Sequence, residues 1–574
     1  MNTRLAIIAL TLLMIIGNVE GAALDEQLPA KQGAAAEEDL LRLGERMYRQ
    51  GMLPNGEPMK AMVAGDVEVD GRMFTCVNCH QRSGLGSVEG SVITWPINGK
   101  ELFIPRRRTG ASNPNKRRQG PGAVQRWSLP KQYQAADARP AFDDKTLARL
   151  LRTGIGPAGE GVMPIMPRYR LDDDDMAVLI HYLKSLSDRP DPGVNDNRIR
   201  FATVITEGVS EIDRNAMLSV LKNHIDVHNT QTRPHIRRAK KGPFYKTEGY
   251  GAYRKLELDV WELKGPEETW EAQLENYYRT RPVFALLGGI GAGSWTPVHQ
   301  FCEKHEIPNI FPITDRPVVS DSDWYTLYFD KGLYQEGEAA ARFLRAKQID
   351  GSMIQIFKSG SRGEEIAKGF EETWKKSGGT GLINKVIENG DDLSSQWMNE
   401  NISSAADTVL LWLEGADAGD LLQGRVFNND PVRTLFVSAT LLAGETDVIP
   451  GNIRDAVFLT HPYSLPGDYE KKSKVLKRWL KMRGIPQTNL DIQAKMYFLG
   501  WMLPGAIKSM RSEFYRDYFL EGFDMMTDQT YAVAIYPRLS FGQGQRYAAK
   551  GCYITQLKND NAAQLSMTGE WVTN

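Results

Sequence analysis

The spacing of apolar positions changes twice along the chain, and each change marks a different kind of structure. A largely apolar run covers residues 5–16. Further on, residues 36–50 and 171–186 carry apolar side chains at intervals of three and four, which predicts two amphipathic helices. From residue 199 onward, short runs rich in branched and aromatic residues alternate with helical patterns. The sequence therefore predicts a small helical domain followed by a larger α/β domain.

The larger domain is expected over residues 199–574. The segments predicted as strands are 199–206, 254–263, 282–291, 307–313, 351–359, 407–413, 433–439 and 454–462. Helical patterns such as EGEAAARFLRAK and EEIAKGFEETWKKSG lie between them. Alternation of this kind predicts parallel sheets with helices on both faces.

A polar segment separates the two patterns. Residues 189–198 hold two prolines, a glycine and no apolar period, which predicts an interdomain linker. The helical domain is accordingly expected over residues 35–188. A division into domains also agrees with the length of 574 residues, which is too great for a single core.

The first residues are predicted to be a secretory signal peptide, residues 1–23. Arg4 precedes the apolar run, and small residues occupy positions 21–23. The run is too short to span a bilayer comfortably. The cleavage region is not a clean A-x-A pattern, so an uncleaved anchor is the alternative. We expect a periplasmic mature chain without a membrane span, in a compartment that permits disulfides.

The strongest chemical motif is Cys76, Cys79 and His80. Two thiols at this spacing can attach to the two vinyl groups of a haem while the imidazole ligates the iron. The alternatives are a redox dithiol or half of a zinc site. The sequence has no second CxxC pair to complete a zinc site, and its one HxxxH pair, His224 and His228, lies far from this motif in the larger domain. We therefore predict one covalently attached haem c, with Cys76, Cys79 and His80 as its anchors.

The order of elements around this motif resembles class I cytochrome c, over roughly residues 36–188. In that family, CxxCH follows a first helix, and a Met-Pro loop precedes a last helix that crosses the first. The resemblance implies a low-spin haem whose sixth ligand is a methionine of this loop. Met163 and Met166 both precede proline, and the spacing from Met166 to Leu171 fits the family better. Met166 is the predicted ligand and Met163 the alternative, although either could merely pack the pocket.

A basic segment, residues 103–127, interrupts the small domain. It is rich in glycine, proline and arginine, and such charge runs are usually solvated surface. It could also dock an acidic redox partner or contact the haem propionates. Over the whole chain, 70 basic and 71 acidic residues give a net charge of -1, so nucleic acid is not an expected partner.

The larger domain contains VFALLGGIGAGSWTPVHQFCEKHEIPNIFPITDRP and IQIFKSGSRGEEIAKGFEETWKKSG. These stretches resemble the periplasmic binding proteins of the leucine/isoleucine/valine type, which have two α/β lobes hinged about a cleft. The resemblance implies that Ser294 and Thr314 contact a ligand carboxylate. Arg362 replaces the family's aromatic residue, which disfavours an aliphatic amino acid and suits a small polar or anionic solute. Ser294 could instead cap a helix, and Thr314 could simply end a strand.

The remaining cysteines are Cys302 and Cys552. By the same resemblance they belong to different lobes, so a disulfide between them would clamp the hinge. We do not expect this bond.

We therefore expect a periplasmic electron-transfer cytochrome whose appended domain binds a small solute or docks a redox partner, such as a dehydrogenase or another cytochrome. The alternative is a solute-binding or sensory protein in which the haem reports or modulates ligand capture. An enzyme is disfavoured, because a haem with His and Met ligands has no open position for substrate. No nucleophile-base pair or carboxylate dyad stands out.

Overall fold

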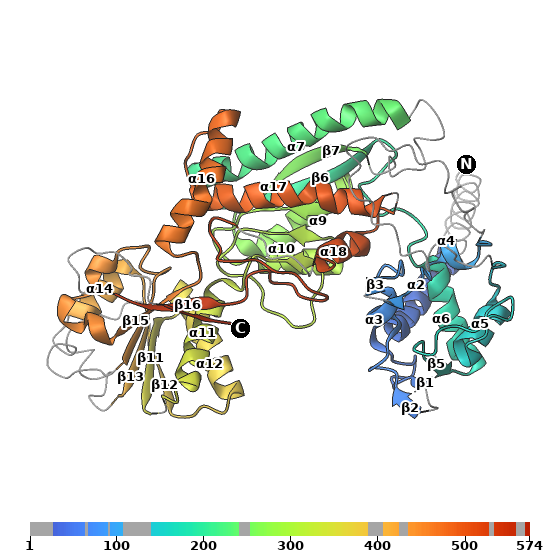
Figure 1. Ribbon diagram of the computed structural model, residues 1–574, viewed down its shortest axis with the longest axis horizontal. Helices are drawn as coiled ribbons and strands as arrows, with labels where there is room; N and C mark the ends of the chain where they lie inside the picture. The colour runs from blue at the N-terminus through green and yellow to red at the C-terminus, as the bar shows by residue number, and fades with distance from the viewer. Residues whose placement is uncertain are drawn as a thin grey trace, which may run out of the picture. The chain divides into compact units, whose positions relative to one another are not determined.

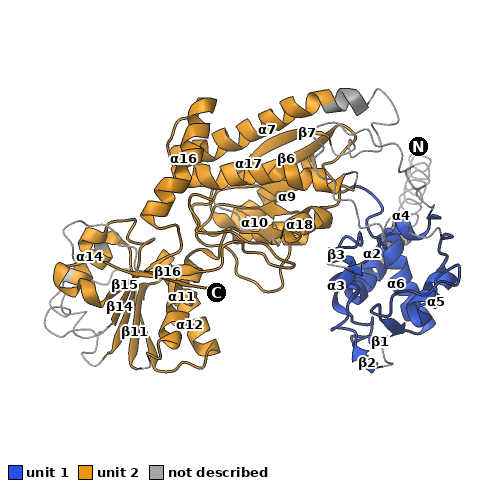
Figure 2. Cartoon of the chain, viewed as in Figure 1, with its two compact units in different colours: residues 1–190 blue, residues 191–574 orange. Residues whose placement is uncertain are grey.

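The computed structural model forms two compact units, Met1–Pro190 and Asp191–Asn574 (Figure 2). The predicted signal peptide and most of the basic segment lie outside the residues that it describes. Among the described helices, none is both long and apolar enough to cross a membrane. The described residues are 27–63, 67–89, 92–106, 139–239, 253–349, 351–388, 406–423, 434–511, 513–526, 533–557 and 569–573.

The first unit is mainly helical. Its helices are α2 (Gln27–Gln50), α3 (Cys76–His80), α4 (Gly99–Leu102), α5 (Asp144–Thr153) and α6 (Asp173–Ser185). Its strands are β1 (Lys60–Val63), β2 (Val67–Asp70), β3 (Val88–Glu89), β4 (Val92–Ile93) and β5 (Arg168–Arg170). They form an antiparallel sheet in the order β2-β1-β5 and a β3-β4 pair, additions to the helical domain that the sequence pattern did not predict.

Helices α2 and α6 cross at Gly44. A β-carbon at this position would lie 2.4 Å from Tyr182 Cβ and 2.9 Å from the Val178 carbonyl oxygen, so the backbones approach too closely for a side chain. Next to this contact, the rings of Tyr48 and Tyr182 pack with centroids 5.5 Å apart. Helix α6 begins where Asp172 accepts a hydrogen bond from the Asp175 amide, as expected of an N-cap. The predicted crossing helices thus enclose the core of the unit.

The second unit contains two α/β lobes. The first lobe has a parallel sheet in the order β10-β9-β8-β6-β7. In Figure 1, helices α7 and α17 lie side by side over this sheet. Its strands are β6 (Arg198–Ile205), β7 (Lys255–Glu262), β8 (Ala285–Leu287), β9 (Asn309–Ile310) and β10 (Thr326–Leu327). Its helices are α7 (Glu211–Ala239), η3 (Glu267–Thr269), α9 (Trp270–Thr280), α10 (Thr296–Lys304), α16 (Pro466–Arg483), α17 (Leu490–Met510) and α18 (Arg516–Asp524).

The second lobe has a sheet in the order β12-β11-β13-β14-β15-β16-β17, of which the first five strands are parallel. Its strands are β11 (Met353–Lys358), β12 (Leu382–Ile387), β13 (Thr408–Trp412), β14 (Thr434–Ser438), β15 (Val457–His461), β16 (Cys552–Gln556) and β17 (Glu570–Val572). Its helices are α11 (Gly332–Ala346), α12 (Arg362–Lys376), α14 (Gly415–Gln423), η4 (Thr446–Val448) and η5 (Gly451–Ala456). The predicted α/β architecture is confirmed.

The chain crosses between the lobes three times. The first crossing follows β10, and the second follows β15. Residues after the second crossing, including those of α16 and α17 and much of 533–549, pack into the core of the first lobe. The third crossing leads into β16. Each lobe is therefore built from segments that are distant in sequence.

The segment expected as a linker is joined to the second unit from Asp191 onward. The Asp191 amide donates a hydrogen bond to the Phe514 carbonyl at 3.1 Å, and its carboxylate accepts one from the Arg516 amide at 2.6 Å. Burial raises the pKa of Asp191 to about 6. The Gly193 carbonyl accepts from the Arg200 amide at 2.8 Å. The boundary between the units accordingly falls between Pro190 and Asp191.

Candidate functional site

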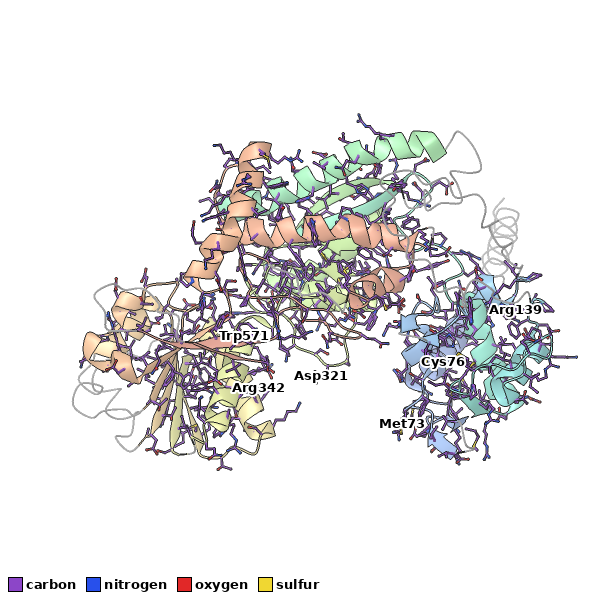
Figure 3. All side chains as sticks on the ribbon, in the orientation of Figure 1. Met73, Cys76, Arg139, Asp321, Arg342 and Trp571 are labelled. Atoms are coloured by element: carbon purple, nitrogen blue, oxygen red, sulfur yellow. The ribbon has the colours of Figure 1, made fainter. Side chains whose placement is uncertain are left out.

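Helix α3 places the residues of the CxxCH motif on one short turn. The Cys76 and Cys79 thiols form no disulfide; Cys76 is half-buried and packs against the core of the unit, whereas Cys79 is exposed. Burial raises the pKa of Cys76 to about 11. Figure 3 labels Cys76 inside this unit, with Met73 at the unit's edge. Neither thiol is therefore committed to a disulfide.

The His80 ring is held by a backbone carbonyl. Its Nδ1 lies 2.9 Å from the Trp95 oxygen. Because a carbonyl only accepts hydrogen bonds, Nδ1 carries the proton and Nε2 is left with the lone pair that a metal requires. Sequence reasoning missed Trp95, although an aromatic residue before Pro96, shortly after the motif, was a usable signal.

The turn after His80 is fixed by two further hydrogen bonds. Gln81 has a φ of 66°, which is unusual for a residue with a side chain. The Tyr48 hydroxyl donates to the Gln81 carbonyl at 2.6 Å, and the Thr94 hydroxyl donates to the Cys79 carbonyl at 2.6 Å. These contacts from α2 and from the residue after β4 hold the end of α3, and with it the orientation of His80.

The two candidate methionines have different surroundings. Met163 is 51% exposed. Met166 is half-buried and packs against the same hydrophobic cluster as Cys76. The exposed apolar side chains of Met73 and Trp95 provide surface near the motif that a flat macrocycle can cover. Together, the two thiols outside any disulfide, the oriented imidazole and the half-buried methionine fit a haem.

The basic segment is described only at its start, residues 103–106, and the described chain resumes at Arg139. The Arg106 guanidinium lies over the Trp95 ring, 4.6 Å from its centroid. Arg139 donates hydrogen bonds to the carbonyls of Glu101 and Leu102, at 2.6 and 3.2 Å, and Figure 3 shows it away from Cys76. Arg107 and Arg108 lie outside the described residues.

In the second unit, Ser294 and Thr314 lie close together at the carboxyl ends of β8 and β9. The Ser294 hydroxyl accepts a hydrogen bond from the Thr296 amide at 3.1 Å, at the start of α10. The Thr314 hydroxyl donates to the Gly293 carbonyl at 3.5 Å and accepts from the Arg316 amide at 3.1 Å. Ligands of open parallel sheets bind at this edge of the sheet.

Arg362 reaches the same place from the other lobe. It begins α12, and its Nε donates a hydrogen bond to the Asp315 carboxylate at 2.6 Å. Its Nη1 lies 3.7 Å from a carboxylate oxygen of Glu414. The structure thus brings Ser294, Thr314 and Arg362 together, but two carboxylates compensate the charge of the arginine. Asp315 was missed, although its place directly after Thr314 was a signal.

A buried carboxylate lies at the carboxyl edge of the second-lobe sheet. Glu336, on α11, is 1% exposed, and its Oε2 accepts hydrogen bonds from the hydroxyls of Ser438 (2.7 Å) and Thr460. Its Oε1 has no hydrogen-bond partner among the described residues. Burial raises the pKa of Glu336 to about 7. Sequence reasoning missed this group, because glutamate is common on helices.

Cys302 and Cys552 are buried, and they are not joined by a disulfide. They lie on different elements, α10 and β16. In the part of the chain that the structure describes, no group of three or more histidine, cysteine, aspartate or glutamate side chains could hold a metal ion.

The two units define two classes of protein: a c-type cytochrome, and a two-lobed α/β protein whose polar residues gather where the lobes meet. The model of the periplasmic binding protein family matches residues 246–562, more than half of the chain. The chain therefore belongs to the periplasmic binding protein family. The model of cytochrome c matches residues 72–187, so the first unit contains a cytochrome c domain, which implies covalently bound haem c. Both predicted resemblances are confirmed.

Among solved structures, the second unit is similar to a leucine-binding protein from Thermotoga maritima, at 15% identity, covering 66% of this chain and 99% of that one, with a TM-score of 0.43. A branched-chain amino acid transporter protein from Thermus thermophilus, with bound valine, has 11% identity, 66% and 98% coverage and a TM-score of 0.45. A solute-binding protein from R. palustris, in complex with benzoate, has 13% identity, 66% and 98% coverage and a TM-score of 0.42. No curated protein matches the chain.

Proposed function

We propose that this protein is a periplasmic cytochrome that carries electrons through one haem c, ligated by His80 and Met166, and that its binding-protein domain holds a small polar solute between its lobes. The observation that carries the electron-transfer proposal is the hydrogen bond from His80 Nδ1 to the Trp95 carbonyl. It leaves Nε2 for the iron, while Met166 packs in the same core as Cys76.

A haem held by His80 and Met166 would supply reversible one-electron chemistry. The protein's part is to keep the two ligands in place. Tyr48 and Thr94 fix the end of α3, and the Trp95 carbonyl increases the basicity of His80 by accepting a hydrogen bond from its Nδ1–H group. A thioether ligand stabilises ferrous iron, so we expect a comparatively positive midpoint potential.

We further propose that the solute contacts Ser294, Thr314 and Arg362. The proximity of these residues supports the proposal, since hydroxyls from one lobe and a guanidinium from the other converge where the lobes meet. An anion at Arg362 must compete with Asp315, which lies 2.6 Å from the guanidinium. A neutral polar solute could instead accept from Arg362 while the ion pair persists.

The haem ligation is tested by a pair of methionine variants. The oxidised protein should show a weak near-infrared band of sulfur-to-iron charge transfer. Met166→Ala should abolish this band and lower the midpoint potential, whereas Met163→Ala, at the 51% exposed position, should leave both unchanged. The opposite result would make Met163 the ligand, and loss of the band in neither variant would exclude both.

The basic segment is proposed to dock an acidic redox partner. Replacing Arg106, Arg107 and Arg108 with Gln should slow electron exchange with an acidic cytochrome or dehydrogenase at low salt. The difference should fade as ionic strength rises, because exposed charges act over a Debye length of about 10 Å at 0.1 M salt. Arg189→Gln, at a position 91% exposed, is the matched control. Equal rates at every ionic strength would make the segment ordinary surface.

A further inference from the structure

Asp315 and Glu414 compensate the positive charge of Arg362. An anionic solute therefore needs another cationic group in this domain. We propose that Lys495 binds the negatively charged end of the solute, and that the solute is a small monocarboxylate. This inference rests on the proposed function, that the second unit holds a solute between its lobes.

Lys495 directly precedes Met496, which packs against the start of the loop that carries Ser294. It is a half-buried residue of α17, one turn before Leu499. A β-carbon at Gly288 would lie 2.9 Å from Met496 Sδ and 3.7 Å from Leu499 Cδ2. Gly288 directly follows β8 and begins the loop that leads to Ser294. This part of α17 therefore covers the carboxyl edge of the first-lobe sheet, where ligands bind in folds of this kind.

Three aromatic rings from different parts of the chain surround the Lys495 ammonium. Its Nζ lies 5.8 Å from the ring centroid of Phe329, 5.9 Å from that of Tyr463 and 5.6 Å from that of Tyr536. Phe329 belongs to the first crossing between the lobes and Tyr463 to the second. The charge therefore lies where the lobes meet, at a position that any movement of the crossing segments would affect.

Aromatic faces attract an ammonium group but do not neutralise it. Among the described residues, no carboxylate oxygen lies within 4.0 Å of Lys495 Nζ. Lys331, by contrast, lies 2.9 Å from the Glu338 carboxylate, and Arg362 lies 2.6 Å from that of Asp315. A half-buried ammonium with no anion as partner, on the helix that packs against the start of the predicted ligand loop, is the group that a solute carboxylate can complete.

The surroundings also limit the charge of the solute. Tyr463 interacts electrostatically with the carboxylates of Asp330, Glu336, Asp491 and Asp315. Asp330 accepts a hydrogen bond from the Tyr536 hydroxyl at 2.6 Å, and Asp491 accepts one from the Tyr469 hydroxyl at 2.7 Å. These acids would repel a second negative charge on the solute. A monocarboxylate is therefore favoured over a dicarboxylate or phosphate.

Calorimetric titration of the haem-loaded full chain tests the inference. The probes are acetate, lactate, benzoate, succinate and inorganic phosphate, with glycerol and ethanolamine as neutral and cationic probes, at constant pH and ionic strength. We expect at least one monocarboxylate to bind and succinate and phosphate to bind at least tenfold more weakly. Lys495→Met should reduce monocarboxylate affinity at least tenfold, Lys495→Arg should restore part of it, and Arg362→Gln should reduce it less than Lys495→Met does.

Lys508→Met is the matched control, because Lys508 is an exposed lysine on the same helix, and it should bind as the wild type does. Thermal unfolding of each variant identifies any that fail to fold; for these, Lys495→Gln replaces Lys495→Met. Unchanged monocarboxylate binding in the Lys495 variants, or tighter binding of succinate or phosphate, would overturn the inference. Binding of glycerol or ethanolamine alone would also overturn it while leaving the proposed function intact. Binding of no probe would count against both.

Discussion

The haem-attachment site and the interlobe site hold their polar groups by different kinds of interaction. In the first unit, the Trp95 carbonyl holds the imidazole of His80, and the hydroxyls of Tyr48 and Thr94 hold the end of α3 by donating to backbone carbonyls. In the second unit, ionisable side chains face one another: Arg362 pairs with Asp315, and Glu336 is buried beside hydroxyl groups.

This difference has an energetic consequence. Hydrogen bonds between neutral groups contribute about 1 kcal/mol each, and the structure tolerates the loss of one of them. A buried charge whose partner is removed costs several kcal/mol. We therefore expect charge changes to affect the second unit most, and steric changes at close backbone contacts to affect the first.

The largest effect is expected at the ion pair of Asp524 and Arg546. Both side chains are nearly fully buried, and Arg546 Nη2 donates to both carboxylate oxygens of Asp524, at 2.7 and 2.6 Å. Asp524→Ala would leave the arginine buried without its anion and should lower the free energy of unfolding of the second unit by about 3–5 kcal/mol. Denaturant titration followed by tryptophan fluorescence measures this change.

The control is Glu271→Gln, which removes an exposed pair with Lys304 (3.1 Å) and should cost less than about 1 kcal/mol. Similar losses in the two variants would contradict the expected role of buried charge.

The next effect concerns pH. The pKa of Glu336 is raised from its usual 4.5 to about 7, so the folded state holds this proton more tightly than the unfolded state does. The stabilisation from this proton is complete below about pH 4.5 and is lost as pH rises to about 7. Between these limits, the second unit should lose about 3 kcal/mol relative to Glu336→Gln.

Unfolding of both proteins from pH 4.5 to 8 measures this difference. The variant retains an oxygen that can accept from Ser438 and Thr460. Arg362, Tyr463 and Cys552 interact electrostatically with Glu336 and are present in both proteins. Parallel stability curves would mean that Glu336 does not titrate in this range.

A steric effect is expected in the first unit, where α2 crosses α6. Gly44→Val would force side-chain atoms into Tyr182 and the Val178 carbonyl, and should destabilise this unit by about 1–3 kcal/mol. Gly161→Ala is the control, because nothing lies within 4 Å of the added β-carbon. Thermal unfolding followed at the haem Soret band reports on this unit. A stable Gly44→Val variant would mean that the helices can separate at little cost.

The smallest effect is expected between the units. We expect saturation with the monocarboxylate that binds the second unit to leave the haem midpoint potential unchanged, because the binding residues and the haem ligands belong to different compact units. Coupling free energy is reciprocal, so an unchanged potential also means equal ligand affinity in both oxidation states. A saturating shift in potential would favour the sensory alternative, in which the haem modulates ligand capture.

Much of this organisation was predictable because it depends on short-range patterns. The CxxCH motif occupies consecutive residues, so Cys76, Cys79 and His80 could be assigned before their surroundings were known. The alternation of strands and helices likewise follows from local periodicity and predicted the α/β class of the second unit. The ligand role of Met166 was inferred by resemblance and stays a prediction.

Charge compensation, in contrast, was decided only by the tertiary structure. Arg362 could be recognised as an arginine at the start of a helix, but its partner Asp315 lies 47 positions away and in the other lobe. Glu336 and Lys495 look like ordinary surface residues of amphipathic helices. Packing buries the first without a counter-charge and surrounds the second with three aromatic rings. Sequence spacing determines which face of a helix a side chain occupies, whereas burial and electrostatic partners depend on the other elements that pack against that face.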